Sequence, residues 1–262
     1  MTVAASPASP VDPRRIEQAG LNALQTQRQL FYDGWLLRLS AGKAKRARSV
    51  NAFFGSTLPL ARKIGYCESV YAQHGLTSLF RMTPFDQPPE LESALATRGY
   101  VAFDETLVQA ALLPQPPEVA EAPEDVAVEA LGADAFVDAV GELRQSPASQ
   151  RDAHRERLAN SPLDKRCVAV RAGNTVVCTA QIAVEDGLAG LYDVVTAEAA
   201  RGNGYATLAC TSLLSWAWQH GAHAAYLQVS ADNAPALAIY RKLGFATIYA
   251  YHYRAPPGAT RE

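Results

Sequence analysis

A loop rich in small residues separates a predicted strand over 188–196 from a predicted helix over 206–220. The loop, Arg201–Ala206, contains Gly202 and Gly204, which let a ligand approach the backbone closely. The first amides of the following helix have no intrahelical partners and lie at the positive end of the helix dipole. These residue types in this order therefore predict an anion-binding turn suited to a diphosphate.

Two common phosphate-binding loops do not fit this turn. A Walker A loop needs the sequence Gly-Lys-Ser/Thr, which is absent. A dinucleotide fingerprint needs a small residue three positions after Gly204, where the chain has Thr207, and it needs a parallel strand–helix–strand unit that is not expected here. The pattern Arg201-x-x-Gly204-x-Ala206 remains. Taken alone, it also fits a tight strand-to-helix turn that binds nothing.

A second pattern lies about 30 residues downstream and reads Asn233-x-x-Ala236-x-x-x-Tyr240-x-x-x-Gly244-Phe245. Together with the glycine loop, it resembles the GCN5-related N-acetyltransferase (GNAT) family. The elements predicted between Val126 and Arg254 have a similar order, with a strand, two helices, three strands, and then helix, strand, helix and strand. The resemblance implies an N-acetyltransferase that moves the acetyl group of acetyl-CoA directly to a primary amine of a small molecule or a protein.

The resemblance also implies where acetyl-CoA would bind. In GNAT enzymes the pyrophosphate lies on the glycine loop, and the pantetheine arm runs beside the end of the preceding strand. The backbone N–H of Val195 is then the expected donor to the thioester carbonyl, where negative charge develops during transfer. The residues expected at the cofactor are Val194, Val195, Thr196, Arg201, Gly202, Asn203, Gly204, Tyr205, Ala206, Asn233 and Tyr240.

Tyr240 occupies the position where the family commonly places a tyrosine near the CoA sulfur. A phenol has an ordinary pKa of about 10, so it can give a proton to a departing thiolate at neutral pH. Aromatic packing within a helix is the alternative role. Asn233 resembles the family's CoA-contacting asparagine, although a plain helix N-cap ahead of Pro235 would look the same in the sequence.

The attacking amine must lose a proton, because primary amines are largely protonated at neutral pH. Asp193 lies two residues before Val195, so strand alternation puts both on one face near the cleft, and Asp193 is the predicted general base. A carboxylate that positions substrate or caps the loop is the alternative role. Glu185 and Asp186, near the preceding hairpin, are further candidates for the base.

A proline-rich stretch at 114–124 divides the chain, because its four prolines cannot continue a helix or a central strand. We expect a loose tail at 1–15, a degenerate GNAT-like domain at 16–113 and a catalytic GNAT domain at 125–262.

The two halves share a pattern of helix and strand ends. Each contains Gln-His-Gly at the end of a predicted helix, and a Gly-aromatic pair follows 24 residues after Gly75 and 23 residues after Gly221. Such aligned signals indicate a duplicated fold. The predicted fold class is α/β (α+β), with two GNAT-like mixed β-sheet domains that have helices on both faces, the first of them degenerate.

The first half keeps this pattern without the chemistry. Strands are predicted at 29–39 and 49–54 and a helix at 58–73. No glycine loop precedes that helix, and Leu95 stands at the counterpart of Tyr240. Segments 33–38 and 48–51 resemble the amino-terminal half of certain bacterial two-domain acetyltransferases. We hypothesise that this half walls the substrate side of the cleft; core and turn positions are the alternative for its residues. The candidate substrate contacts are Trp35, Arg38 and Asn51.

Composition argues against several other functions. The chain has 262 residues, a net charge of −2 and one short basic run (Lys43, Lys45, Arg46 and Arg48), so nucleic-acid binding is not expected. That run is expected to be a solvated turn, with a contact to substrate or to the CoA 3′-phosphate as the alternative. The apolar runs are too short for a membrane span, and no signal peptide is evident, so a cytoplasmic location is expected.

The four cysteines show no C-x-x-C spacing, and the chain lacks a His-Glu-x-x-His motif, so no metal site is predicted. A non-catalytic acyl-CoA-binding sensor is the alternative to an enzyme. Tyr240 beside an intact glycine loop favours the enzyme, since binding alone needs no proton donor. The sequence indicates neither the acceptor nor the oligomeric state.

Overall fold

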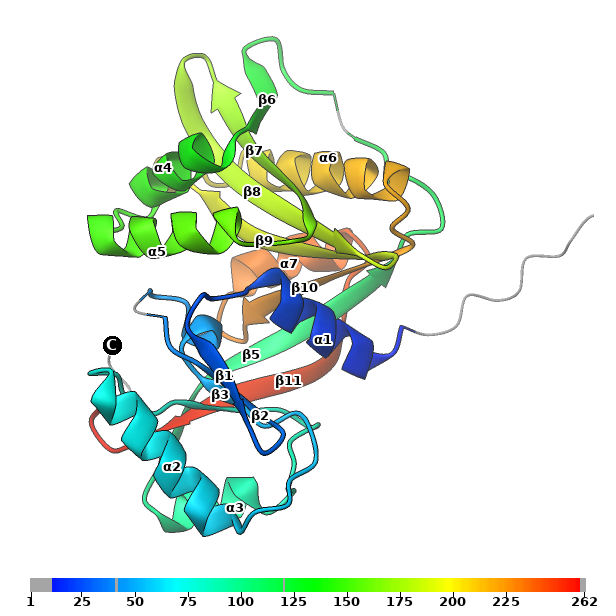
Figure 1. Ribbon diagram of the computed structural model, residues 1–262. Helices are drawn as coiled ribbons and strands as arrows, with labels where there is room; N and C mark the ends of the chain where they lie inside the picture. Colours follow the sequence, from blue (N-terminus) through cyan, green and yellow to red (C-terminus); the bar gives the residue numbers. More distant parts are fainter. Residues whose placement is uncertain (1–10, 41, 120, 260–262) are drawn as a thin grey trace, which may run out of the picture.

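The computed structural model describes residues 11–40, 42–119 and 121–259. Figure 1 shows two sheet regions, each with its own helices, joined through long central strands. The elements of the first half are α1 (Pro13–Ala23), β1 (Gln29–Tyr32), β2 (Trp35–Arg38), a 3₁₀ turn (Lys45–Ala47), β3 (Val50–Asn51), α2 (Leu60–Gln73), β4 (Phe80–Met82), α3 (Leu91–Thr97) and β5 (Val101–Leu112).

The second half follows the predicted element order. Its elements are β6 (Val126–Leu131), α4 (Ala133–Leu143), α5 (Ala148–Ala159), β7 (Asp164–Ala172), β8 (Thr175–Glu185), β9 (Leu188–Thr196), a 3₁₀ turn (Glu198–Ala200), α6 (Tyr205–Gln219), β10 (Ala224–Ser230), α7 (Ala234–Lys242) and β11 (Ala246–Ala255). Each predicted helix and strand of this half is confirmed to within a few residues.

The described strands form one mixed sheet of 11 strands, in the order β1-β2-β3-β4-β11-β5-β10-β9-β8-β7-β6. The last strand of each half is exchanged: β11 lies between β4 and β5, and β5 lies between β11 and β10. Both exchanged strands follow a glycine with positive φ, Gly99 before β5 and Gly244 before β11. They pair antiparallel from Val101 opposite Ala255 to Ala110 opposite Ala246. The exchange ties the two halves together.

The apolar side chains of the second half cover both faces of its sheet. One cluster packs α6 against β7 to β10, and it includes Cys210, Leu213 and Leu227. On the opposite face, Phe136 of α4 and Leu158 of α5 pack in a smaller cluster. Helices therefore lie on both faces of this sheet, as predicted, and β9 is packed between them.

A buried ion pair and a hydrogen bond anchor α1 to β4 and β11. The carboxylate of Glu17 accepts hydrogen bonds from both terminal nitrogens of Arg81 on β4, one of them at 3.0 Å. It also accepts a hydrogen bond from the Tyr249 hydroxyl on β11 at 2.7 Å. Glu17 and Arg81 are almost fully buried, and the Arg81 guanidinium helps to lower the pKa of Glu17 against the effect of burial.

Two local predictions about the first half are wrong. The strand expected at 29–39 is a hairpin of β1 and β2, because Asp33 and Gly34 take positive φ values of 45° and 82°. Residues 13–15 are helical rather than part of a loose tail, and residues 1–10 of that expected tail lie outside the described residues. The side chain of Asp12 caps α1 by accepting from the Arg14 amide, and Pro13 occupies the first turn, a start signal that was readable in the sequence.

Candidate active site

β9 and β10 separate partway along their length. Their parallel pairing runs from Leu188 and Ala224 to Leu191 and Leu227. Beyond this point β9 continues beside β8, and β10 continues beside β5. Among the described strands, none pairs with the other edge of Tyr192–Thr196. The backbone groups on this edge are available to pair with an extended ligand.

A bulge at Asp193 decides which backbone groups face the gap. The register between β8 and β9 shifts between Thr179 and Gln181, and Asp193 has a φ of 49°. The Asp193 carbonyl accepts a hydrogen bond from Thr179 Oγ1 at 3.3 Å and therefore faces β8. In a trans peptide the next N–H points the opposite way. The N–H of Val194 therefore faces the gap.

The backbone of Val195 faces β8, contrary to the prediction for this residue. The N–H of Ala197 donates to the Val177 carbonyl on β8 at 2.9 Å, so the carbonyl of Thr196 points into the gap. Strand alternation then directs the backbone of Val195 toward β8. Val195 is therefore not the free amide, and Val194 takes its place. The sequence located the strand end but gave no sign of the bulge, which shifts the alternation by one residue.

The glycine loop has the conformation of an anion-binding turn. Gly202 and Gly204 have φ values of +85° and +79°, and a Cβ added at either would meet no protein atom within 4 Å. Gly204 is the N-cap of α6, and the first helical bond runs from the Leu208 N–H to the Gly204 carbonyl at 3.0 Å. The preceding amides of the helix start therefore have no helical partner. Space and donors are both present for a diphosphate.

The free edge of β9, the glycine loop and α7 enclose a cavity of about 290 Å³, here called the β9–α7 pocket. It brings together seven of the residues expected at the cofactor, although the two sequence patterns are separated along the chain. Its lining residues are Val194, Val195, Thr196, Arg201, Ala206, Asn233, Pro235, Ala236, Ile239 and Tyr240.

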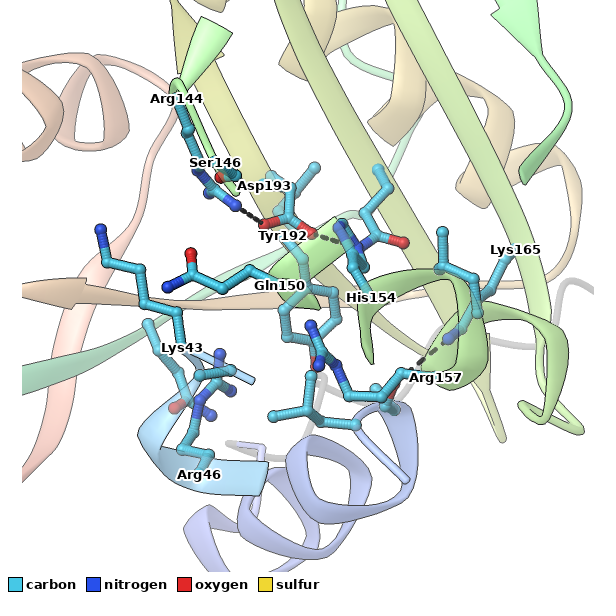
Figure 2. A pocket seen from close by; sticks show the side chains of 17 residues that line it. Lys43, Arg46, Arg144, Ser146, Gln150, His154, Arg157, Lys165, Tyr192 and Asp193 are labelled. Carbon is cyan, nitrogen blue, oxygen red and sulfur yellow. Dashed lines mark hydrogen bonds and ion pairs between the residues drawn. The ribbon is translucent and has the colours of Figure 1, made fainter. Parts of the chain in front are cut away.

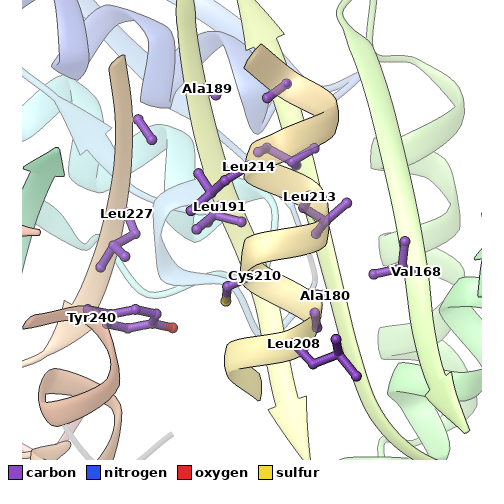
Figure 3. Close-up of a cluster of buried hydrophobic side chains, with 14 of the residues drawn as sticks. Val168, Ala180, Ala189, Leu191, Leu208, Cys210, Leu213, Leu214, Leu227 and Tyr240 are labelled. Carbon is purple, nitrogen blue, oxygen red and sulfur yellow. The ribbon is translucent and has the colours of Figure 1, made fainter. Parts of the chain in front are cut away.

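Tyr240 lies where the β9–α7 pocket meets the core cluster under α6. Figure 3 shows its ring extending from α7 toward α6, where Cys210 lies. The side chain is 8% exposed, and burial raises the pKa of its hydroxyl well above the ordinary value for tyrosine. The phenol therefore keeps its proton through the neutral range. No described residue hydrogen-bonds to this hydroxyl, so the proton is available to a ligand.

Asn233 caps α7 in the way that its alternative interpretation predicts. Its side-chain oxygen accepts a hydrogen bond from the Ala236 N–H at 3.2 Å. It also lines the β9–α7 pocket. A capping role and a ligand contact are compatible here, because the carboxamide nitrogen does not take part in the cap. Asn203 is oriented within the glycine loop by donating to the Ala200 carbonyl at 3.1 Å.

A second cavity, of about 400 Å³, lies at the start of the gap and is here called the basic pocket (Figure 2). Tyr192 and Asp193 of β9 line it, so it adjoins the strand segment that lines the β9–α7 pocket. The other lining residues are Ala23, Leu24, Lys43, Ala44, Arg46, Arg144, Ser146, Gln150, His154, Arg157, Leu158, Lys165, Gln181, Leu191 and Gln228.

Asp193 is held by Arg144, His154 and Gln181 in this pocket, which argues against its predicted role as general base. Its carboxylate lies 2.6 Å from Arg144 Nη1 and 3.3 Å from His154 Nε2, and it accepts from Gln181 Nε2 at 2.5 Å. Despite burial, Arg144 and His154 hold the pKa of Asp193 well below its usual range. A carboxylate stabilised in this way is a weak proton acceptor at neutral pH. Its alternative role, positioning, fits the geometry.

The two further candidates for the base are also engaged elsewhere. Glu185 lies 3.5 Å from Arg15 Nη2 and accepts from Asn22 Nδ2 at 2.9 Å, both on α1. Asp186 lies 3.4 Å from the same Arg15 nitrogen. Neither residue lines the basic pocket.

The first half reaches the basic pocket through residues other than the three that were predicted. Trp35, Arg38 and Asn51 are at most 3% exposed and are bonded to protein carbonyls, so burial prevents the predicted substrate contacts. Lys43 and Arg46 of the basic run line the pocket instead. The loop at 42–46 packs closely on α5, because a Cβ placed on Gly42 would lie 2.8 Å from Arg157 Nη1.

His154 is the residue that sequence reasoning missed. It lies on α5, where its ring packs edge-on against Phe136 with centroids 6.1 Å apart. Its Nε2 faces the Asp193 carboxylate at 3.3 Å. Because 39 residues separate the two along the chain, no local pattern pairs them.

The described residues contain no group of three or more His, Cys, Asp or Glu side chains placed to hold a metal ion. No helix in the described part of the chain is both long enough and apolar enough to cross a membrane.

Comparison with known proteins agrees with this geometry. Residues 11–254 match the family described as "Probable histone acetyltransferase Rv0428c C-terminal". The uncharacterized N-acetyltransferase YobR of Bacillus subtilis (strain 168) is 27% identical over 248 residues, which cover 93% of this chain and 98% of that protein.

Solved structures share the fold. A GCN5-related N-acetyltransferase from Kribbella flavida matches with a TM-score of 0.71 and 20% identity, covering 94% of this chain and 96% of that one. A tandem GNAT protein from the clavulanic acid biosynthesis pathway matches with a TM-score of 0.61 and 16% identity, over 79% and 74% of the two chains. The family match spans nearly the whole chain, which therefore belongs to this acetyltransferase family and is an acyltransferase of the GNAT type.

Proposed function

We propose that the protein transfers the acetyl group of acetyl-CoA directly to a primary amine. The observation that carries this proposal is the continuity of two pockets along β9. The β9–α7 pocket is lined by residues of the glycine loop and by Tyr240. The basic pocket is lined by Tyr192 and Asp193, which directly precede Val194 on the same strand. A donor and an acceptor bound in these pockets would meet at Asp193 and Val194.

The residues of the β9–α7 pocket fit acetyl-CoA. The amides at the start of α6 would hold the diphosphate, with Gly202 and Gly204 leaving the space that it needs. The Thr196 carbonyl would pair with the pantetheine arm along the free edge of β9. The Val194 N–H would stabilise negative charge on the thioester oxygen, an interaction that contributes about 2.7–4 kcal/mol in other enzymes.

Tyr240 and His154 are the proposed proton-transfer groups. Acetyl-CoA supplies an activated thioester; the amine nitrogen bonds to its carbonyl carbon, and the carbon–sulfur bond breaks. Tyr240 gives its proton to the departing sulfur, because its hydroxyl is neutral and has no protein partner among the described residues. The Asp193 carboxylate lies 3.3 Å from His154 Nε2 and favours a proton on that nitrogen, which would leave the lone pair of Nδ1 to take a proton from the amine.

The test is release of free thiol from acetyl-CoA in the presence of a panel of primary amines, with the acetylated product identified by mass spectrometry. Amine-dependent thiol release with a matching product supports the proposal. Tight CoA binding without thiol release from acetyl-CoA in the presence of any of these amines would instead favour the acyl-CoA-binding sensor. The matching family is that of a probable histone acetyltransferase, so the panel includes a lysine-rich peptide besides small amines.

A further inference from the structure

Positive charge gathers around the basic pocket, although the chain as a whole carries a net charge of −2. Among the described residues that line it, Asp193 is the one carboxylate. The cationic lining residues are Lys43, Arg46, Arg144, Arg157 and Lys165. The field in the pocket is therefore local and opposite in sign to the charge of the whole protein.

Most of this positive charge is not neutralised within the protein. Arg144 is paired with Asp193. Among the described residues, no carboxylate lies within ion-pair distance of Lys43, Arg46, Arg157 or Lys165. Lys165 donates to the Ala23 carbonyl at 3.2 Å, which satisfies one donor but not the charge. The pocket thus holds cations without counter-ions.

Two guanidinium groups also have buried donors without acceptors. Arg46 Nη1 and Arg157 Nε are buried, and neither makes a hydrogen bond in the described structure. Arg157 Nη1 donates a hydrogen bond to the Ala153 carbonyl of its own helix at 2.9 Å. Buried charged donors are costly unless they are paired, and carboxylate or phosphate oxygens satisfy guanidinium donors with the best geometry.

The position of the pocket indicates that an anion bound there would belong to the acceptor rather than to CoA. The glycine loop that suits the CoA diphosphate follows β9, whereas the basic pocket adjoins Tyr192 and Asp193 at the opening of the gap. A volume of about 400 Å³ is in the range of small-molecule sites. A lysine-rich peptide would add positive charge to a cationic pocket, which is unfavourable.

We infer that the acceptor is a small primary amine that carries a carboxylate or phosphate group away from the reacting nitrogen. Arg157, Arg46 and Lys165 bind that group, and the amine extends to Asp193 and His154. This inference rests on the proposed function, because it identifies the acceptor of that transfer.

The inference is tested with pairs of amines that differ only in whether they carry the carboxylate or phosphate group. β-Alanine is compared with β-alaninamide for the carboxylate, glucosamine 6-phosphate is compared with glucosamine for the phosphate, and a lysine-rich peptide provides the cationic arm. We expect kcat/KM to be at least about tenfold higher for the anionic member of one pair, and lowest for the peptide. Equal values within both pairs, or preference for the peptide, would overturn the inference.

Two variants of α5 test whether Arg157 is responsible for the preference for anionic amines. Arg157→Gln should lower the ratio of anionic to neutral kcat/KM by about tenfold or more, because it removes a charge-assisted contact. Arg155→Gln removes the same charge two residues away, where Arg155 pairs with Asp134 and Asp138 outside the pocket, and it should leave the ratio unchanged. An unchanged ratio in Arg157→Gln would contradict the inference.

Calorimetric titration separates this inference from the proposed function. β-Alanine and glucosamine 6-phosphate are titrated into wild type and Arg157→Gln in the presence of CoA. If no amine is acetylated but one probe binds to wild type and not to Arg157→Gln, transfer is refuted and the anion site stands. If neither transfer nor binding occurs, both proposals fail.

Discussion

Substituting Gly204 by alanine isolates the contribution of the glycine loop to cofactor binding. Gly204 has a φ of +79°, and a Cβ there meets no protein atom within 4 Å. The cost to folding is therefore conformational only, about 1–2 kcal/mol for an L-residue in the left-handed region. For a chain of this size, that corresponds to a fall in Tm of roughly 2–8 °C.

The effect on CoA binding should be larger than this. If the diphosphate lies against the loop backbone, the added Cβ displaces it from at least one amide. A charge-assisted hydrogen bond contributes about 1.5–3 kcal/mol, which weakens CoA binding by about 10- to 150-fold. Because the protein itself leaves the space open, a loss of this size reports the ligand rather than a rearranged loop.

Gly99→Ala is the matched control, since Gly99 has a φ of +81° and equally open surroundings but lies before β5 in the first half. Both variants should lose similar stability in thermal unfolding, and only Gly204→Ala should lose CoA affinity in calorimetric titration. Activity with acetyl-pantetheine, which lacks the diphosphate, should fall equally little in both. Equal CoA affinity in the two variants would refute a diphosphate site at this loop.

Three further predictions follow from individual contacts. His154→Gln should lower kcat with a saturating amine by roughly 100-fold, whereas Arg155→Gln on the same helix should leave kcat unchanged; a wild-type kcat in His154→Gln would exclude His154 as the proton acceptor. Burial, together with Arg157 nearby, lowers the pKa of Lys165 to about 8, with Asp193 and Cys167 opposing the shift. Lys165 is cationic below that pH and neutral above it, so KM for an anionic acceptor should rise as pH passes through about 8 and should rise less in Lys165→Met; a flat profile for wild type would contradict this. Glu17→Gln leaves Arg81 buried without its counter-ion and should reduce the free energy of unfolding by about 3–5 kcal/mol in urea titrations, whereas the exposed Glu124→Gln should have little effect; equal stability of the two variants would show that the pair does not anchor α1.

The sequence predicts those parts of the fold that depend on local signals. The glycine loop, the N-cap at Asn233 and the order of elements from β6 to β11 follow from periodicity and from residues that start or end helices. The exchange of β5 and β11 could not be predicted, because strand pairing between residues as distant as Val101 and Ala255 leaves no local pattern. Two further features were marked in the sequence but were not predicted. The Asp33-Gly34 pair is typical of a hairpin turn, and Asp12 followed by Pro13 is typical of a helix start.

The sequence predicted most of the β9–α7 pocket and little of the basic pocket. Seven of the residues expected at the cofactor meet in one pocket because each lies near a strand end or a helix end that the sequence marks. The basic pocket instead combines Arg46, Arg157 and Lys165 from three separate segments, and only the packing of the 42–46 loop on α5 brings them together. The bulge at Asp193 exchanges the roles of Val194 and Val195, and it depends on the pairing of β8 with β9.

Single-turnover acetyl transfer in Tyr240→Phe would show whether Tyr240 donates the proton to the departing sulfur during direct transfer. Tyr66→Phe serves as the control, because it removes a partly exposed hydroxyl from the first half. We expect Tyr240→Phe to slow transfer by roughly 100-fold or more and to bind CoA with nearly wild-type affinity, while Tyr66→Phe retains the wild-type rate and affinity. Transfer at the wild-type rate in Tyr240→Phe would exclude Tyr240 as the proton donor.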